Sequence, residues 1–367
     1  MSSSPVPADL GPTLAQFALI GEFVSAAPYG SGHINDTLVV NQVLTGGRPR
    51  RYIAQRINDR IFKNVPALMD NIRRVTAHLT AKAGPASREL RLVPTHDGQP
   101  YARDDAGGWW RVYDFIEGAH TVDRVTGEAE AREAARAFGD FQARLADLPG
   151  GRLQETIPNF HHTRSRFENF RRALQEDRVG RAAEVPAEIE FAFSREADAD
   201  VLLNLLARGE ITERVTHNDT KINNVMLDDA THRAVAVIDL DTVMPGLPLY
   251  DFGEMMRTSA SSTFEDDPVA ENMRLELPYF RALVEGYLAS AVGAVLNATE
   301  RAHLAFAGKL MTYENGLRFL TDYLQGDTYY KIKHPRHNLE RCRTQFALVR
   351  DIERQTGALD RILAELA

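Results

Sequence analysis

One segment in the second half of the chain carries residue types that suit phosphoryl transfer. It runs from Thr216 to Asn224 as THNDTKINN, and IDLD follows it at Ile238–Asp241. Phosphoryl transfer needs little covalent help from a protein: the acceptor hydroxyl is aligned, metal ions are fixed across the phosphates, and negative charge is neutralised. The two stretches contain side chains for each of these tasks.

Four of these residues can be given separate roles. Asp219 can hold an acceptor hydroxyl and accept its proton, and Lys221 can face the transferring phosphoryl group. Asn224 and Asp239 offer oxygen ligands, which Mg²⁺ prefers while it keeps several waters. A polar turn in front of a hairpin would use similar residues, but the register of the four favours catalysis.

A second motif lies near the N-terminus. Gly30-Ser-Gly32 precedes the β-rich run DTLVV, and glycines without a Cβ let backbone N–H groups approach a phosphate. A turn before any hairpin looks the same, so the motif indicates a phosphate loop only together with Asp219 and Asp239.

The elements that must position these residues change character along the chain. Before about residue 117, we expect a hairpin over 36–57, a helix from residue 65 capped by Asn64, and three short strands. Beyond it, helical patterns dominate. They cover 126–148, 163–176, 186–208, 249–258, 272–296, 300–324 and 337–366, with a β-hairpin over 224–238. The uncharged stretch 286–299 predicts a buried helix.

The catalytic segment resembles the loop of the kinase superfamily, H-x-D-x-x-x-x-N followed by a metal-binding aspartate. The IDLD version is similar to the aminoglycoside phosphotransferase and choline kinase branch. This resemblance implies an α+β, two-lobed, protein-kinase-like fold: a small β-sheet lobe with one main helix, 1–117, binds the nucleotide, and a larger helical lobe, 118–367, carries the catalytic loop and the acceptor site. It also implies ATP as co-substrate, with Mg²⁺.

A closer resemblance covers nearly the whole chain and points to the N-acetylhexosamine 1-kinases. It rests on PYGSGHIN at 28–35, WRVY at 110–113, AFGDFQ at 137–142, VTHNDTK at 215–221, IDLDT at 238–242, GLRFL at 316–320 and DYLQGD at 322–327. That family transfers the ATP γ-phosphate to the anomeric hydroxyl of GlcNAc or GalNAc.

The same resemblance implies roles for individual residues. His33, Asn35, Arg318 and Tyr329 would approach the sugar, while Asp251, together with His217 of the loop, would brace the catalytic loop from behind. A lone arginine on a long helix is also commonly a solvated or paired charge.

The nucleotide side departs from the kinase pattern. The strand RYIAQRI has Gln55 where kinases carry a lysine, and Arg56 cannot share its face because neighbouring strand residues point to opposite sides. The helix from residue 65 also lacks the usual glutamate. After the last strand, the segment with Phe115 and Glu117 could pair with adenine through its backbone, although an ordinary linker between lobes would use the same residues.

Composition narrows the function class. The chain has 43 Lys and Arg against 51 Asp and Glu, a net charge of −8, which argues against a general nucleic-acid binder. Cys342 is the single cysteine, no apolar stretch is long enough to predict a membrane span, and no Lys or Arg precedes Arg48, so we expect a cytoplasmic protein. The oligomeric state is left open.

Two other functions stay open at this stage. One is a kinase for another small hydroxyl acceptor, such as an aminoglycoside, choline or homoserine. The other is a catalytically inactive ATP-binding protein, suggested by the missing strand lysine. We expect no metal at His161-His162 and a solvated surface at Glu265–Asp267.

Overall fold

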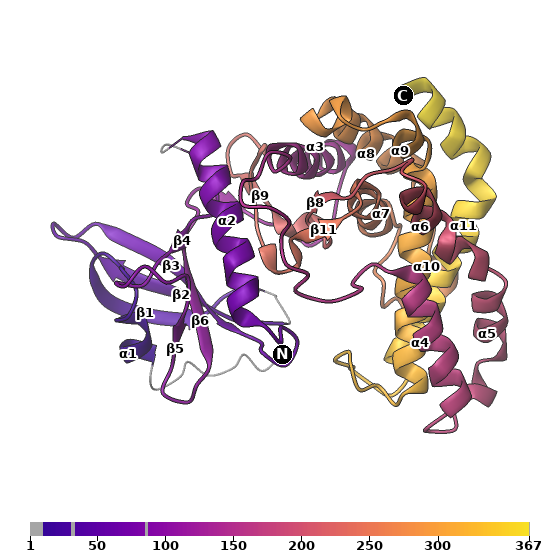
Figure 1. Ribbon diagram of the computed structural model, residues 1–367, viewed down its shortest axis with the longest axis horizontal. Coiled ribbons are helices and arrows are strands. Elements are labelled where there is room, and N and C mark those ends of the chain that lie inside the picture. The colour runs from indigo at the N-terminus through magenta and orange to yellow at the C-terminus, as the bar shows by residue number, and fades with distance from the viewer. Residues whose placement is uncertain (1–9, 31–33, 85–86, 367) are drawn as a thin grey trace.

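The computed structural model describes residues 10–30, 34–84 and 87–366. Figure 1 shows a β-rich lobe, in indigo and purple, beside a larger helical lobe that runs from magenta to yellow. This arrangement confirms the predicted α+β class, with a small sheet lobe that carries one long helix.

The N-terminal lobe is an antiparallel sheet packed against one long helix. Its elements are α1 (Leu10–Leu14), β1 (Glu22–Pro28), β2 (Asp36–Val43), β3 (Pro49–Ile57), α2 (Val65–Ala83), β4 (Leu92–Val93), β5 (Ala102–Arg103) and β6 (Trp109–Asp114). The strand order is β1-β2-β3-β6-β4, and β5 also pairs with β6. The predicted hairpin is β2 and β3.

Side chains alternate between the two faces of this sheet, so the two faces carry different residues. Leu38, Ala54 and Val112 are buried in a small core that α1 covers. Because successive side chains point to opposite faces, Gln55 and Arg111 lie on the other face, and the two residues are cross-strand partners.

Helix α2 begins as the sequence predicts and ties the lobes together. Asn64 caps it by accepting a hydrogen bond from the backbone N of Ala67 at 3.1 Å. Asn71 is fully buried and donates to the carbonyl oxygens of Gln154, at 2.8 Å, and Val243, at 3.2 Å. The side chain of Asn71 therefore fixes α2 to the backbone of the helical lobe.

The helical lobe contains two small sheets among its helices. Its elements are β7 (Ala119–His120), α3 (Glu128–Arg144), α4 (Thr163–Glu176), α5 (Pro186–Phe193), α6 (Val201–Ala207), β8 (Arg214–Thr216), β9 (Val225–Asp228), β10 (Ala234–Val237), β11 (Met244–Gly246), α7 (Pro248–Ser259), α8 (Leu277–Ala289), α9 (Ala298–Ala302), α10 (Leu304–Leu324) and α11 (His337–Leu366). Short 3₁₀ helices lie at Ala182–Glu184, Glu196–Asp200, Ile222–Asn224, Leu240–Thr242, Ala270–Asn272 and Ala291–Ala294.

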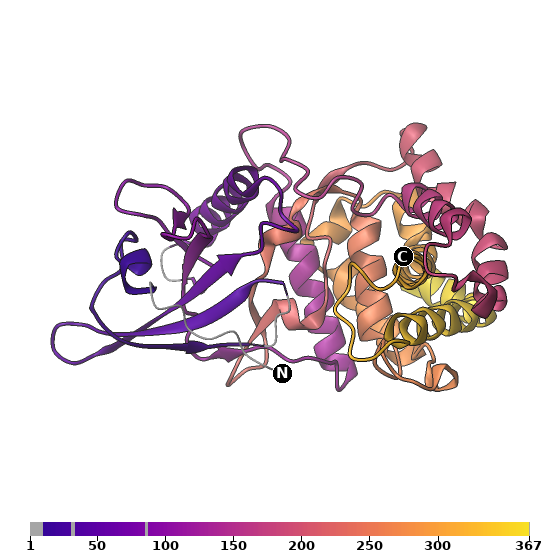
Figure 2. The same ribbon diagram turned by 90° about the horizontal axis from the view of Figure 1, so that it is seen from below.

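The small sheets carry the catalytic segment. Strand β9 pairs with β10 and β7, and β8 pairs with β11. In Figure 2 the salmon-coloured strands of the β9–β10 hairpin lie where the purple sheet lobe meets the helical lobe. The chain passes between the lobes after β6; the boundary at residue 117 stays a prediction.

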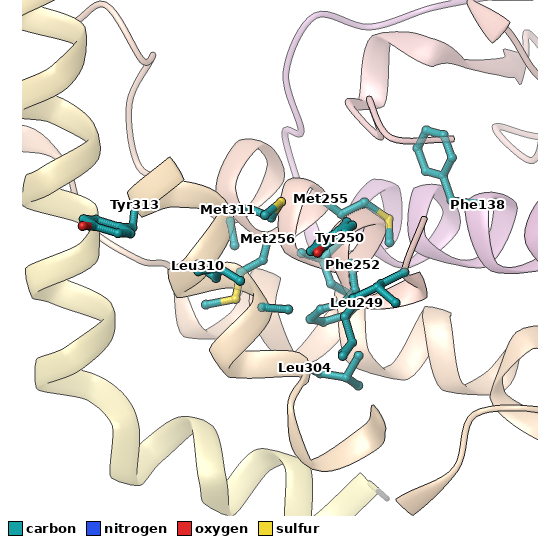
Figure 3. Close-up of a cluster of buried hydrophobic side chains, with 14 of the residues drawn as sticks. Phe138, Leu249, Tyr250, Phe252, Met255, Met256, Leu304, Leu310, Met311 and Tyr313 are labelled. Carbon is teal, nitrogen blue, oxygen red and sulfur yellow. The ribbon is translucent and has the colours of Figure 1, made fainter. Parts of the chain in front are cut away.

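Helix α7 runs through the centre of the helical lobe and packs against α10. Figure 3 shows this cluster, with Leu249, Phe252 and Met256 of α7 near Leu304 and Met311 of α10. The two helices approach closely at glycines: a Cβ on Gly308 would lie 2.0 Å from Met256 Sδ, and one on Gly253 would lie 2.4 Å from the carbonyl oxygen of Ala307. The contact gives α7 a rigid support.

Two predicted helices differ from the structure. The expected helix over 186–208 is broken at Glu196–Asp200, because Glu196 and Asp200 turn toward Arg164, with contacts of 2.8 and 2.5 Å. The stretch 286–299 is not one helix. Helix α8 ends at Ala289, and Asn297 starts α9 with a capping box, so the stretch is divided between the end of one helix, a short 3₁₀ turn and the start of another. Within the described ranges, no helix has both the length and the apolarity needed to cross a membrane.

Candidate active site

The catalytic loop between β8 and β9 places Asp219 beside Lys221. Lys221 Nζ lies 2.9 Å from Asp219 Oδ1, and the side chains are 43% and 25% exposed. Burial alone would raise the pKa of Asp219, but the charge of Lys221 and its hydrogen bond outweigh that effect and keep the pKa below its usual range. The charge of Asp219 in turn raises the pKa of Lys221. At neutral pH the pair is a carboxylate and an ammonium group.

Asn224 and Asp239 come together through the β9–β10 hairpin. Asn224 Nδ2 donates to the carbonyl oxygen of Asp219 at 2.8 Å, which leaves its Oδ1 for a cation. The backbone N of Ile238 donates to the carbonyl oxygen of Asn224 at 2.9 Å, so Asp239 follows directly beside it. Asp239 has φ 58° and ψ 62°, a left-handed conformation that is uncommon outside glycine and occurs at functional sites.

The donor set around Asp239 fits a divalent cation brought by a nucleotide. Desolvation, with the like charges of Asp241 and Asp219, raises the pKa of Asp239 to about 7. In the described part of the chain, no group of three or more His, Cys, Asp or Glu side chains could hold a metal ion. One carboxylate and one amide oxygen suit Mg²⁺ when phosphate oxygens and waters supply the remaining ligands.

Asp251 supports the loop from α7. Its buried carboxylate accepts hydrogen bonds from the backbone N of His217, at 2.9 Å, and of Asn218, at 2.7 Å, and from the side chain of Gln142. His217 Nε2 lies 2.9 Å from the carbonyl oxygen of Ile238. Desolvation raises the pKa of Asp251. These contacts hold the catalytic loop against α7; the bracing role that the resemblance implies for Asp251 and His217 stays a prediction.

The segment that follows β1 reaches the helical lobe through Asn35. Gly30 has a φ of 79°, and no atom within 4 Å would obstruct a Cβ there; Gly32 and His33 lie outside the described residues. Asn35 Oδ1 accepts a hydrogen bond from the backbone N of Asn58 at 3.0 Å, and its Nδ2 donates to Asp241 Oδ2 at 2.6 Å. Asn35 therefore contacts the turn that carries Asp239 and Asp241.

Gln55 and Arg56 point to opposite sides, as strand alternation predicts. Arg56 Nε lies 3.7 Å from Asp104 Oδ2. Gln55 Nε2 donates to Thr37 Oγ1 at 3.0 Å, and Gln55 Oε1 accepts from Arg111 Nε at 2.9 Å. Arg56 therefore does not supply positive charge on the face of the sheet where Gln55 and Arg111 lie.

Arg111 and Asp241 form a buried ion pair that joins the two lobes, and the sequence assigned a role to neither. Their side chains are 1% and 5% exposed. Burial lowers the pKa of Arg111, but the charge of Asp241 more than compensates, so the pKa lies above its usual range. One sequence signal exists: a charged residue inside the apolar strand WWRVYD needs a buried partner.

The segment after β6 packs against the sheet lobe. The guanidinium carbon of Arg51 lies 3.8 Å from the centre of the Phe115 ring, and Arg51 pairs with Glu117, with Nε to Oε1 at 3.0 Å. The Tyr29 ring meets Phe115 edge-on at 5.7 Å. The nucleotide-binding role of Phe115 and Glu117 stays a prediction.

Comparison with known families identifies this constellation. The family model APH, described as the phosphotransferase enzyme family, matches residues 25–287, which include the catalytic loop and Asp239. The chain belongs to this phosphotransferase enzyme family.

Solved structures show the kinase-like fold of the family. An aminoglycoside phosphotransferase from Alicyclobacillus acidocaldarius has a TM-score of 0.57 at 14% identity, over 100% of this chain and 98% of that chain. An amicoumacin kinase in complex with AMP-PNP, Ca²⁺ and Ami has a TM-score of 0.56 at 15% identity, over 90% of each chain. A choline/ethanolamine kinase family protein from Mesorhizobium loti has a TM-score of 0.53 at 15% identity, over 94% and 92%. At these identities the similarity shows the fold alone.

This phosphotransferase has a cavity of about 310 Å³ between α4, α10 and the segment after α10. Its lining contains Arg166, Asn169, Arg172, Arg318, Thr321, Asp322, Gln325, Tyr329 and Tyr330. The structure therefore brings together two of the predicted sugar-binding residues, Arg318 and Tyr329. The guanidinium carbon of Arg318 lies 5.7 Å from the Tyr330 ring centre, and Tyr329 is 60% exposed.

The cavity is cationic. Arg166 Nη2 donates to the carbonyl oxygen of Phe160 at 2.6 Å, and Arg318 Nη1 donates to Asn315 Oδ1 at 3.4 Å. Desolvation and the like charge of Arg318 lower the pKa of Arg166. Among the residues that the structure describes, no carboxylate lies within ion-pair distance of Arg166, Arg172 or Arg318, although the charges of buried Glu314 and Glu254 help to raise the pKa of Arg318.

Asp322, the acidic residue of the lining, is occupied by hydrogen bonds to neighbouring groups. Asp322 is buried, and its carboxylate accepts hydrogen bonds from the backbone N atoms of residues 328–330, at 2.8–2.9 Å, and from Asn338 Nδ2. Asp322 therefore anchors the segment with Tyr329 instead of pairing with an arginine.

A buried charge cluster lies between this cavity and the catalytic loop. Asn315 donates to Glu254 at 3.4 Å, Glu254 pairs with buried Arg257, and Arg257 Nη1 lies 3.0 Å from Glu265 Oε2. The charge of Arg257 also helps to lower the pKa of Asp219. Glu265 is thus the partner of a buried arginine, and the expectation of a purely solvated acidic run at 265–267 is wrong.

His161 is a supporting residue that no sequence pattern singles out. Its buried ring bonds to the carbonyl oxygen of Asn218 at 2.9 Å and to Glu314 on α10 at 2.8 Å. Burial lowers the pKa of His161, but the hydrogen bond and charge of Glu314 outweigh it and raise the pKa above its usual value. The ring connects the catalytic loop to the helix that also carries Arg318.

Proposed function

We propose that this phosphotransferase uses ATP to phosphorylate the anomeric hydroxyl of N-acetylhexosamines, giving the sugar 1-phosphate. The observation that carries the proposal is the cationic cavity, because it contains Arg318 and Tyr329 at the positions expected for sugar binding. A cavity of about 310 Å³ is at the lower end of the usual range for small-molecule sites, about 300–1,000 Å³.

The charge of the cavity distinguishes between acceptor classes. A polycationic aminoglycoside needs carboxylates in its site, and a quaternary ammonium group such as choline prefers an electron-rich aromatic cage. The lining has three arginines and one acid, Asp322, which is bonded to backbone N–H groups, so it offers neither the carboxylates nor the open aromatic cage that these cations need. Guanidinium groups instead donate hydrogen bonds to hydroxyl and carbonyl oxygens, which an N-acetylated sugar offers.

The proposed chemistry assigns one step to each residue. Asp219 is ionised, so it can accept the proton of the anomeric hydroxyl while the sugar oxygen bonds to the γ-phosphorus and the bond to the ADP oxygen breaks. Lys221 neutralises charge on the transferring group. Asn224 and Asp239 bind Mg²⁺ that arrives with ATP as part of the substrate.

The remaining predicted residues form the proposed binding surfaces. The backbone at Gly30 and Gly32 and the side chain of Gln55 would contact the phosphates, and the segment with Phe115 and Glu117 would contact adenine. His33 would approach the acceptor from the sheet lobe, and Asn35, whose amide is bonded to Asn58 and Asp241, would border the acceptor from the phosphate side.

The test is an ATP-consumption assay with matched acceptors: GlcNAc, GalNAc, their methyl glycosides blocked at O1, kanamycin, choline and homoserine. The proposal expects ADP release with the two free sugars and none with the methyl glycosides, whose anomeric oxygen has no proton. Turnover of kanamycin, choline or homoserine in preference to the sugars would replace this proposal with another small-molecule kinase. No turnover of any acceptor by protein that binds ATP would favour an inactive ATP-binding protein.

A further inference from the structure

We propose that Arg111, fixed by Asp241 and Gln55, is the positioning cation that replaces the strand lysine missing from β3. Gln55 occupies the strand position where the kinase pattern has lysine, and the charge is supplied from the adjacent strand β6. The inference rests on the ATP-dependent part of the proposed function and does not depend on which acceptor is used.

The strand register explains how a positive charge on β6 can take the place of one on the neighbouring strand β3. Thr37, Gln55 and Arg111 are successive cross-strand partners on β2, β3 and β6. Side chains that are directly opposite have Cβ atoms about 4.5–5.5 Å apart, well within the reach of an arginine. The hydrogen bonds follow the same row, from Arg111 Nε to Gln55 Oε1 at 2.9 Å and from Gln55 Nε2 to Thr37 Oγ1 at 3.0 Å.

Asp241 converts this row into a connection between the lobes. One carboxylate oxygen pairs with Arg111 Nη1, and the other accepts from Asn35 Nδ2 at 2.6 Å. Asp241 stands two residues after Asp239, within the same short turn. Through Asp241, the turn that carries Asp239 is therefore bonded to Arg111 on β6 and to Asn35, which precedes β2.

The charge balance gives Arg111 a second effect. The carboxylates of Asp219, Asp239 and Asp241 influence one another, and Lys221 and Arg111 are the cations that oppose them. Without Arg111, Asp241 would be a buried anion with no cationic partner, two residues from Asp239. Arg111 itself is only 1% exposed. It therefore acts through Asp241 and Gln55 and is a positioning residue.

The test compares ATP with adenosine, since only ATP presents phosphates. Calorimetric titrations in Mg²⁺ would measure both dissociation constants for the wild type, for Arg111→Gln, and for the exchange Gln55→Lys with Arg111→Gln. We expect Arg111→Gln to weaken ATP binding by about 10-fold or more while adenosine binding changes less than about 2-fold. The exchange returns the cation to β3 and should recover most of the lost ATP affinity.

Two further variants separate this role from a structural one. Arg111→Met with Asp241→Leu replaces the buried pair with apolar groups, a change that often leaves stability unaltered. A melting curve checks that it folds. Because the connection through Asp241 is lost, it should still lose preference for ATP over adenosine, and a wild-type preference would overturn the role of Arg111. Arg214→Gln removes an arginine 3.1 Å from buried Glu300 in the helical lobe. This control should lower the melting temperature and leave the ATP-to-adenosine ratio unchanged.

Each outcome decides between explanations. An unchanged ratio in Arg111→Gln, or an exchange variant no better than the single variant, would overturn the role of Arg111 while the proposed function stands. A wild-type protein that binds ATP no better than adenosine would contradict the proposed function as well.

Discussion

The phosphate end and the acceptor end of this phosphotransferase are built in different ways. At the phosphate end, carboxylates dominate: Asp219, Asp239 and Asp241 are opposed by Lys221 and Arg111. At the acceptor end, arginines dominate the cavity, and its acid, Asp322, is committed to backbone N–H groups.

This difference in charge suggests separate roles: the phosphate end for the phosphoryl transfer common to the family, and the cavity for the choice of acceptor. Negative charge at the phosphate end suits Mg²⁺ bound to ATP, which every acceptor would require. In the proposed function, the arginines of the cavity select among acceptors by charge. The match to the family model identifies a phosphotransferase, and the cavity supports the more specific proposal.

The largest expected effect is the loss of turnover when the metal is removed, because this change acts on the phosphate end and not on the acceptor end. EDTA should abolish turnover, and added Mg²⁺ should restore it, because the two protein ligands bind only hard cations through oxygen. Asp239→Ala should weaken binding of the ATP and Mg²⁺ pair and leave acceptor binding intact, as measured by calorimetry. Full turnover in metal-free buffer would contradict the roles given to Asn224 and Asp239.

The next effect concerns the proton acceptor. Asp219→Asn preserves the shape of the side chain but removes its charge, so turnover should fall by about 10²–10⁴-fold. The variant should still fold and bind ATP, which a titration and a melting curve would check. Turnover equal to that of the wild type would show that another group accepts the proton.

A smaller effect is expected at the acceptor end, where a variant should change binding of the acceptor and not of ATP. Arg318→Ala removes charged hydrogen bonds from a partly buried group and should raise the Michaelis constant of the acceptor by about 10–100-fold, with little change for ATP. Arg172→Ala is the matched control: the residue is exposed on the same cavity and should change the constant by less than about 5-fold. Equal effects on ATP and acceptor would contradict the division of the site into two ends.

The sequence predicts the phosphate end better than the acceptor end because of how each is assembled. Asp219, Lys221 and Asn224 are near neighbours in the chain and contact one another within one loop, so their spacing alone is informative. Arg166 and Tyr329 come from different elements, and their common cavity depends on the packing of α4 with α10.

Long-range pairs were the other features that sequence patterns could not supply. Arg111 meets Asp241 across 130 positions, and His161 meets Glu314 across 153. Local periodicity also cannot show that Glu196 and Asp200 turn toward Arg164 and interrupt the helix predicted over 186–208. By contrast, the β2–β3 hairpin and the Asn64 cap depend on neighbouring residues and were predicted correctly.

The smallest expected effect is a pH dependence of stability at the junction of the two ends. The pKa of His161 is raised in the folded protein above its unfolded value of about 6.5. Its extra stabilisation is therefore fully present below that pH and is lost as the pH rises through the folded pKa. The difference in unfolding free energy between wild type and His161→Gln, from urea titrations, should be larger at pH 6 than at pH 9. A difference independent of pH would mean that His161 stays neutral.

The most direct test of the central claim is phosphorus NMR of the product formed from GlcNAc and ATP. Asp219 is proposed to take the proton of the anomeric hydroxyl, so the product phosphorus should couple to the single proton H1. The same spectrum from Asp219→Asn should show this product forming far more slowly. A phosphorus signal coupled to two methylene protons would identify a 6-phosphate and contradict the sugar 1-kinase mechanism.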